Sequence, residues 1–275
     1  MMPAAMVKLQ SCNRHGGALK LHRRGAFGEV SNALLQPVSP ANPSIEEGGT
    51  ELAISYLHLG VAPLLPCSTG RGGARNRADR ESHALTAAHI ANLSAAKRHA
   101  AAMGLPFTRM LTIHWKAAGV PLSGMVRANG RFTDLLTKFL ARHGTATTWL
   151  WTNENGPGKG WHCHILAHVP AALVDGLVNL QRGWLRSITG NPYRASVIKS
   201  EPDGGRLGLE RGNPDLHAVN LEVAFGYVCK GAPQAVLDAA GIDRMHEPGG
   251  RVLGKRCGTS QNIGATARSK AMTDG

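Results

Sequence analysis

The chain has 275 residues, of which 43% are hydrophobic and 18% charged, so it can bury a substantial core. Its 31 Lys and Arg exceed its 18 Asp and Glu, and the net charge of +13 favours a polyanionic partner such as nucleic acid or an anionic membrane surface. The five cysteines include no C-x-x-C pair, which argues against a disulfide framework or a zinc knuckle. We therefore expect a cytoplasmic protein. No apolar run is long enough to span a bilayer and no signal-peptide pattern is present, so we expect no membrane partner.

The two ends of the chain are predicted to be flexible. Residues 1–80 are rich in Gly, Pro, Arg and Ser without periodicity, which is typical of a basic extension. Alanine and spaced apolar residues then predict a helix from Ala78 to Met103, and we take residues 81–104 as the helix leading into the domain. Residues 236–275 are expected to form a basic tail that is partly ordered at best from Pro248 onward.

The remaining pattern, over residues 105–235, predicts an α+β domain with helices packed on an antiparallel sheet. Alternating apolar residues or turn signals favour strands, and apolar residues at helical spacing favour helices. The predicted strands are 107–115, 145–152, 160–169 and one within 193–201, and the predicted helices are 131–144, 172–188 and 215–231. Residues 153–160, NENGPGKG, are expected to be the loop that joins two of these strands in a hairpin.

The strand GWHCHILAHV carries three histidines in alternate or near-alternate positions. Because successive side chains of a strand point to opposite faces, His162, His164 and His168 share one face, while Cys163 lies on the apolar face that can pack inward. Same-face neighbours are about 7 Å apart, so His162 and His164 can lean onto one ion. Two imidazoles with an oxygen ligand form a plausible divalent-metal site.

The third ligand of such a site is either Glu154 or His168. We favour Glu154, because a carboxylate suits Mg²⁺ or Mn²⁺ and the hairpin brings it back beside the histidine pair. The alternative is that the histidines form a half-exposed polar face or are satisfied core residues. Three alternating histidine ligands, as in histidine-triad nucleotide hydrolases, would need the middle one at position 166, which is Leu166.

Tyr227 and Lys230 lie three residues apart in the last predicted helix, within GYVCKG. This spacing places them on one helix face, about 5–6 Å apart. A phenol becomes a better nucleophile beside a cation and a metal-polarised phosphate, so the pair is suited to nucleophilic attack. The same spacing is also common on ordinary amphipathic helices, where the tyrosine packs and the lysine is solvated.

The three motifs occur in the order of a known family. The strand FTRMLTIHW, the His-x-His strand at His162 and His164, and the helix motif YVCK resemble the HUH endonucleases, in particular the single-tyrosine rolling-circle replication initiators of plasmids and phages. Glu154 matches the acid that precedes the histidine hairpin in that family. The resemblance covers about residues 105–235. The carboxylate that some relatives carry one helical turn before the tyrosine is absent, because Val223 and Ala224 stand there.

The resemblance implies an RRM-like sheet core and a defined chemistry. His162, His164 and Glu154 would bind Mg²⁺ or Mn²⁺, and Tyr227 would attack a phosphate of single-stranded origin DNA, leaving a 5′-phosphotyrosine and a free 3′-OH. Lys230 would offset negative charge during attack, and host helicase and polymerase would be partners. Basic flanks such as GGRVLGKRCG would hold the DNA backbone. An HUH relaxase, a single-strand transposase and a non-catalytic DNA-binding protein with the same fold remain alternatives.

Overall fold

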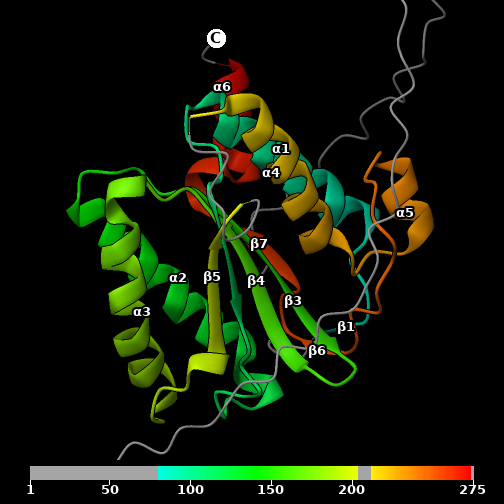
Figure 1. Cartoon of the computed structure of the whole chain (residues 1–275). Helices are drawn as coiled ribbons and strands as arrows, with labels where there is room; N and C mark the ends of the chain where they lie inside the picture. The colour runs from blue at the N-terminus through cyan, green and yellow to red at the C-terminus, as the bar shows by residue number, and fades with distance from the viewer. Residues whose placement is uncertain (1–79, 204–211, 274–275) are drawn as a thin grey trace, which may run out of the picture. The chain divides into compact units, whose positions relative to one another are not determined.

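A computed structural model describes residues 80–203 and 212–273. The predicted extension over residues 1–80 lies outside these ranges apart from its last residue. The described part is built on a five-stranded antiparallel sheet in the order β5-β2-β4-β3-β7, so the predicted α+β class is confirmed (Figure 1). The strands are β2 (Arg109–Ile113), β3 (Trp149–Gly156), β4 (Gly160–Ala167), β5 (Ile198–Pro202) and β7 (Cys257–Thr259). A separate pair joins β1 (Glu81–Ser82) to β6 (Val252–Leu253).

Helices cover both faces of the five-stranded sheet (Figure 1). They are α1 (Ala87–Ala102), α2 (Met125–Arg142), α3 (Val174–Thr189), α4 (Pro214–Cys229), α5 (Gln234–Ala239) and α6 (Ala265–Thr273). Short 3-10 turns lie at Leu122–Gly124, Ala171–Leu173, Ala195–Val197 and Gln261–Ile263. Apolar side chains of α2 and α3 pack on one face with Cys163 and Ile165, and those of α1 and α4 pack on the other with Leu166. The histidine face of β4 is therefore covered by helices too.

Two helices begin at other residues than the sequence pattern predicts. The first begins at Ala87 rather than Ala78, because the Thr86 side chain accepts a hydrogen bond from the backbone N–H of His89 and so caps the helix there. The second begins at Met125, before the predicted residue 131. Its early turns include Asn129, a weak helix former, but the Asn129 side chain is buried and hydrogen-bonded to Trp115.

The hairpin strand β3 is longer than predicted. It continues through residues 153–156, which the composition assigned to the loop, and Gly156 pairs with Gly160. The turn is thus confined to residues 157–159, where Gly158 adopts a φ of 77° that favours glycine. The extension matters for the site because it moves Glu154 from a loop into a strand directly beside β4.

The prediction of a flexible tail over residues 236–275 is wrong. This segment contains part of α5 and all of β6, β7 and α6, and β7 is an edge strand of the main sheet, with Trp151 of β3 opposite Gly258. Arg256 is buried, and its guanidinium donates hydrogen bonds to the backbone oxygens of Ser82, Asn153 and Gly249. These bonds join the tail to the sheet, so at least this arginine of GGRVLGKRCG is structural rather than a DNA contact.

Candidate metal centre

The β3–β4 hairpin places one carboxylate and two imidazoles on the same face of the sheet. Glu154 is paired with His162 across the two strands, and Thr152 is paired with His164. Directly opposite side chains lie on one face, and alternation brings His164 to the same face as His162. Glu154, His162 and His164 are all at most 4% exposed. The predicted pair of histidines and the favoured third ligand therefore do lie together.

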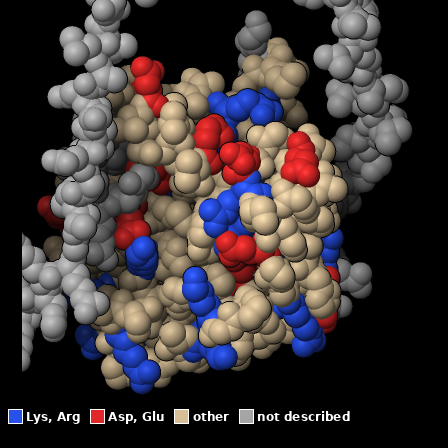
Figure 2. Space-filling model, turned by 45° about the vertical axis from the view of Figure 1, so that its right-hand side comes forward, with Lys and Arg blue, Asp and Glu red and all other residues tan. Residues whose placement is uncertain are grey.

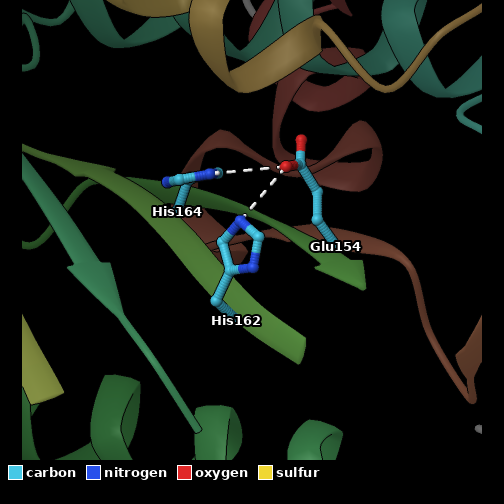
Figure 3. Close-up of side chains that lie close together, drawn as sticks. All are labelled: Glu154, His162 and His164. Carbon is cyan, nitrogen blue, oxygen red and sulfur yellow. Dashed lines mark ion pairs between the residues drawn. The ribbon is translucent and has the colours of Figure 1, made fainter. Parts of the chain in front are cut away.

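The three side chains converge on one oxygen atom (Figure 3). Glu154 Oε2 lies 3.2 Å from His162 Nε2 and 3.5 Å from His164 Nε2. One ligand atom from each residue lies within 4.8 Å of the others, a spacing at which one metal ion can be held. Among the described residues, no other group of three or more His, Cys, Asp or Glu side chains has ligand atoms this close together.

The outer nitrogens of both imidazoles have partners that orient the rings. His162 Nδ1 lies 2.7 Å from the Gly160 carbonyl oxygen, which can only accept, so Nδ1 carries a proton and Nε2 faces Glu154. His164 Nδ1 contacts the Thr112 hydroxyl at 2.9 Å. A hydrogen bond at the ring nitrogen that faces away from the ion is typical of metal-binding histidines.

Two buried polar atoms of the group also favour a bound metal ion. Glu154 Oε1 and His164 Nε2 are buried and have no hydrogen-bond partner in the described part of the chain. Buried polar atoms without a partner are rare, and an ion is one of the few explanations for them. The donor set of two nitrogens and one oxygen suits a divalent cation, so the residues present fit a metal ion.

The charge states of the group suit metal binding as well. Burial lowers the pKa of His164 to about 4 and outweighs the opposing effect of Glu154, so the ring is neutral near pH 7. Burial by itself raises the pKa of Glu154, but the close contacts with His162 and His164 and the charge of Lys230 hold it well below its usual value. A neutral imidazole and an ionised carboxylate are the forms that ligate a metal.

Tyr227 reaches this group from the last turn of α4. Its ring centroid is 4.9 Å from that of His164, in an edge-on arrangement. The end of the helix is tied to the sheet because the Thr152 hydroxyl donates a 3.0 Å hydrogen bond to the Val228 carbonyl. Burial, with the charges of Glu154 and Glu247, raises the pKa of the Tyr227 phenol.

Lys230 lies three residues after Tyr227 and is buried, with its side chain 4% exposed. Its ammonium group contacts Glu154 Oε2 directly and lies 4.7 Å from the Tyr227 ring centroid. The predicted proximity of Lys230 to Tyr227 is therefore present. The main partner of the lysine is nevertheless the carboxylate of the metal-binding group.

His168, the alternative third ligand, lies elsewhere, and so do Glu222 and Trp161. His168 Nδ1 bonds to the Pro106 carbonyl oxygen at 2.7 Å, and the residue lines a different pocket. Glu222 of α4 forms an ion pair with Lys97 of α1. Trp161 packs against the core and donates its indole N–H to the Val120 carbonyl.

Sequence reasoning missed two side chains beside the group. The Thr112 hydroxyl holds His164, and the His114 ring lies 5.5 Å from the His162 ring. Alternation does place Thr112 of β2 and His114, which follows that strand, on one side of the chain, yet only the register of β2 against β4, which pairs Thr112 with His164, reveals their role. Both residues line a pocket of about 330 Å³ with His162, His164, Tyr227 and the lysines Lys159 and Lys199.

Comparison of the chain with protein-family models, with curated proteins and with solved structures gives no significant match. Among the described helices, none combines the length and the apolar character needed to cross a bilayer. The site is therefore interpreted from its own geometry.

Proposed function

We propose that this chain is an HUH-type endonuclease, a replication initiator that nicks single-stranded DNA at an origin. One observation carries the proposal: a tyrosine at the end of α4 lies 4.9 Å, ring to ring, from a histidine of a buried Glu-His-His group. The order of motifs in the sequence and the antiparallel sheet with helices on it are consistent with such an enzyme.

The chemistry follows from the side chains around the pocket. Glu154, His162 and His164 would hold Mg²⁺ or Mn²⁺, which when bound acts as a Lewis acid on a phosphodiester oxygen. The Tyr227 oxygen attacks phosphorus, the bond to the 3′ oxygen breaks, and a 5′-phosphotyrosine and a free 3′-OH result. The phenol proton passes to water, and the departing 3′ oxygen takes up a proton. A host helicase and polymerase would then use the freed end.

Cations near Tyr227 support this role. Burial and the two carboxylates nearby raise the pKa of the phenol, so its deprotonation needs positive charge in the transition state. Lys230 supplies one such charge 4.7 Å from the ring, and its contact with Glu154 holds it in place. We therefore assign Lys230 to charge compensation at the attacking oxygen.

The substrate is assigned from the pocket rather than from a broad charged surface. Figure 2 shows Lys and Arg intermixed with Asp and Glu on the face it presents, so positive charge there does not form one continuous patch. The pocket itself is lined by Lys159 and Lys199 beside the histidines, and such cations suit a DNA phosphate. HUH relaxases and single-strand transposases would share this arrangement.

The test is formation of a covalent protein–DNA adduct. Labelled single-stranded DNA from the gene's own locus is incubated with the full chain and Mn²⁺ and resolved on a denaturing gel. We expect an adduct that is lost in Tyr227→Phe. Tyr193→Phe is the matched control, because Tyr193 also lies beneath an arginine, Arg182 at 5.6 Å, but lines a different pocket. No adduct and no bound Mn²⁺ with wild-type protein would favour a non-catalytic DNA-binding protein.

A further inference from the structure

The loop after α5 carries an arginine outside the region of the sequence motifs. The guanidinium carbon of Arg244 lies 5.0 Å from the centroid of the Tyr227 ring, and its Nη2 contacts Glu247 at 2.9 Å. Its Nε is buried and has no hydrogen-bond partner in the described part of the chain. A guanidinium that lies over an aromatic ring with a donor left over is suited to bind an anion.

The loop is held in place by side-chain and backbone bonds. The Gln234 side chain donates to the Arg244 carbonyl at 3.2 Å and accepts from the His246 N–H at 2.8 Å. The Glu247 N–H donates to the Lys230 carbonyl at 2.9 Å. Arg244 is thus presented by a loop tied to both α5 and the end of α4, which lowers the entropic cost of using it as a binding residue.

Tyr227 stands between two neighbouring pockets. The pocket that contains His162 and His164 shares Met110, Glu201 and Tyr227 with a second pocket of about 340 Å³ that contains Arg244. A strand that places a phosphate at the Tyr227 hydroxyl and extends past the ring therefore enters the second pocket. Among the described residues that line this second pocket, Arg244 is the only Lys or Arg.

The second pocket also contains acidic side chains, which makes its arginine more important. Glu201 and Asp203 line it, and Glu201 is paired with Lys199 at 2.8 Å, so part of its charge is offset. An anionic backbone that approaches acidic side chains needs a cation nearby to offset their repulsion. Arg244, beside Tyr227, is placed to do so.

We propose that Arg244 binds the DNA backbone phosphate adjacent to the phosphate that Tyr227 attacks. The inference rests on the proposed function for its substrate class, single-stranded DNA. It adds a substrate-binding residue from the C-terminal segment, which the sequence predicted to be a tail.

The test measures binding of fluorescein-labelled oligothymidylate by anisotropy over a salt series. The full chain carries Tyr227→Phe and the buffer contains EDTA, so that no cleavage occurs. We expect Arg244→Ala to weaken binding by roughly 10-fold, the effect of losing one charged hydrogen-bond partner. The slope of log affinity against log salt should fall by about 0.7, the value for one phosphate contact on a single strand.

Two further variants separate a phosphate contact from general effects. Arg244→Lys keeps the charge and should keep the salt slope. Lys138→Ala removes a cation that is likewise paired with a carboxylate, Asp134 at 2.9 Å, but lies outside both pockets, and its slope should stay that of the parent. The inference is overturned by an unchanged slope in Arg244→Ala, by an equal loss in Lys138→Ala, by Arg244→Lys behaving as alanine does, or by no binding to the parent chain.

The outcome is separable from that of the proposed function. Binding that depends on Arg244 in a chain that forms no adduct would retain this inference and remove the nicking activity. Adduct formation in a chain whose salt slope does not change in Arg244→Ala would retain the nicking activity and remove this inference.

Discussion

Replacing Glu154 with Gln should destabilise the chain because it leaves the Lys230 ammonium buried without its main counter-charge. The two side chains are 5% and 4% exposed, and breaking such a buried pair from one side costs about 3–5 kcal/mol. Glu247 Oε2 lies 4.0 Å from the ammonium and is half exposed, so it compensates in part. We therefore expect the lower end, about 3 kcal/mol in the free energy of unfolding.

The assay is urea denaturation in EDTA of wild type, Glu154→Gln, Lys230→Met and the double variant. Because each single change leaves a buried polar group without its partner, the double variant should be more stable than the sum of the single effects implies, by about 2 kcal/mol. The control cycle uses the exposed pair Asp134 and Lys138, 2.9 Å apart, where coupling should stay below about 0.5 kcal/mol. Additive effects at Glu154 and Lys230 would refute the claim that these charges compensate one another.

Three further predictions concern the metal, the cysteines and one glycine. Mn²⁺ at 100-fold excess over its Kd should raise the Tm by roughly 5–10 °C, as scanning calorimetry would show, and His164→Ala but not His168→Ala should abolish the shift. Burial raises the pKa of Cys229 to about 12 and that of Cys257 to about 11. The unfolded thiols lose their protons from about pH 8.5 while the folded ones keep theirs, so stability should fall as pH rises above that value, and replacing both by Ala should flatten the decline in urea titrations. Gly250 has a φ of 60°, and a Cβ there would overlap a backbone oxygen of β3, so Gly250→Ala should lower the midpoint of urea denaturation by more than Gly130→Ala, a position with open space.

The histidine strand could be predicted from the sequence because its signal is local. Alternation alone assigns His162 and His164 to one face and Cys163 to the other, and Cys163 is indeed buried in the opposite core cluster. The sequence places Glu154 in a loop instead, because its surroundings are rich in Asn and Gly. The β-pairing that extends β3 past Thr152 is a tertiary effect that local propensity does not report.

The tail and its contribution to the site could not be predicted because they depend on distant partners. Strand β7 has three residues, and Gly258 allows the Trp151 side chain to approach its backbone. Neither the composition nor the periodicity of the segment signals this packing. Arg244 lies in an irregular loop whose position comes from Gln234 and the end of α4, so no spacing rule indicates that it reaches Tyr227.

The most direct test of the account is identification of the residue that becomes attached to DNA. Wild-type chain is incubated with Mn²⁺ and single-stranded DNA from its own locus, digested, and the modified peptide is sequenced by mass spectrometry. The account predicts a nucleotide linked through phosphate to Tyr227, with no adduct in Tyr227→Phe or in the metal-ligand variant His164→Ala. An adduct on another residue, or one that persists in Tyr227→Phe, would contradict it.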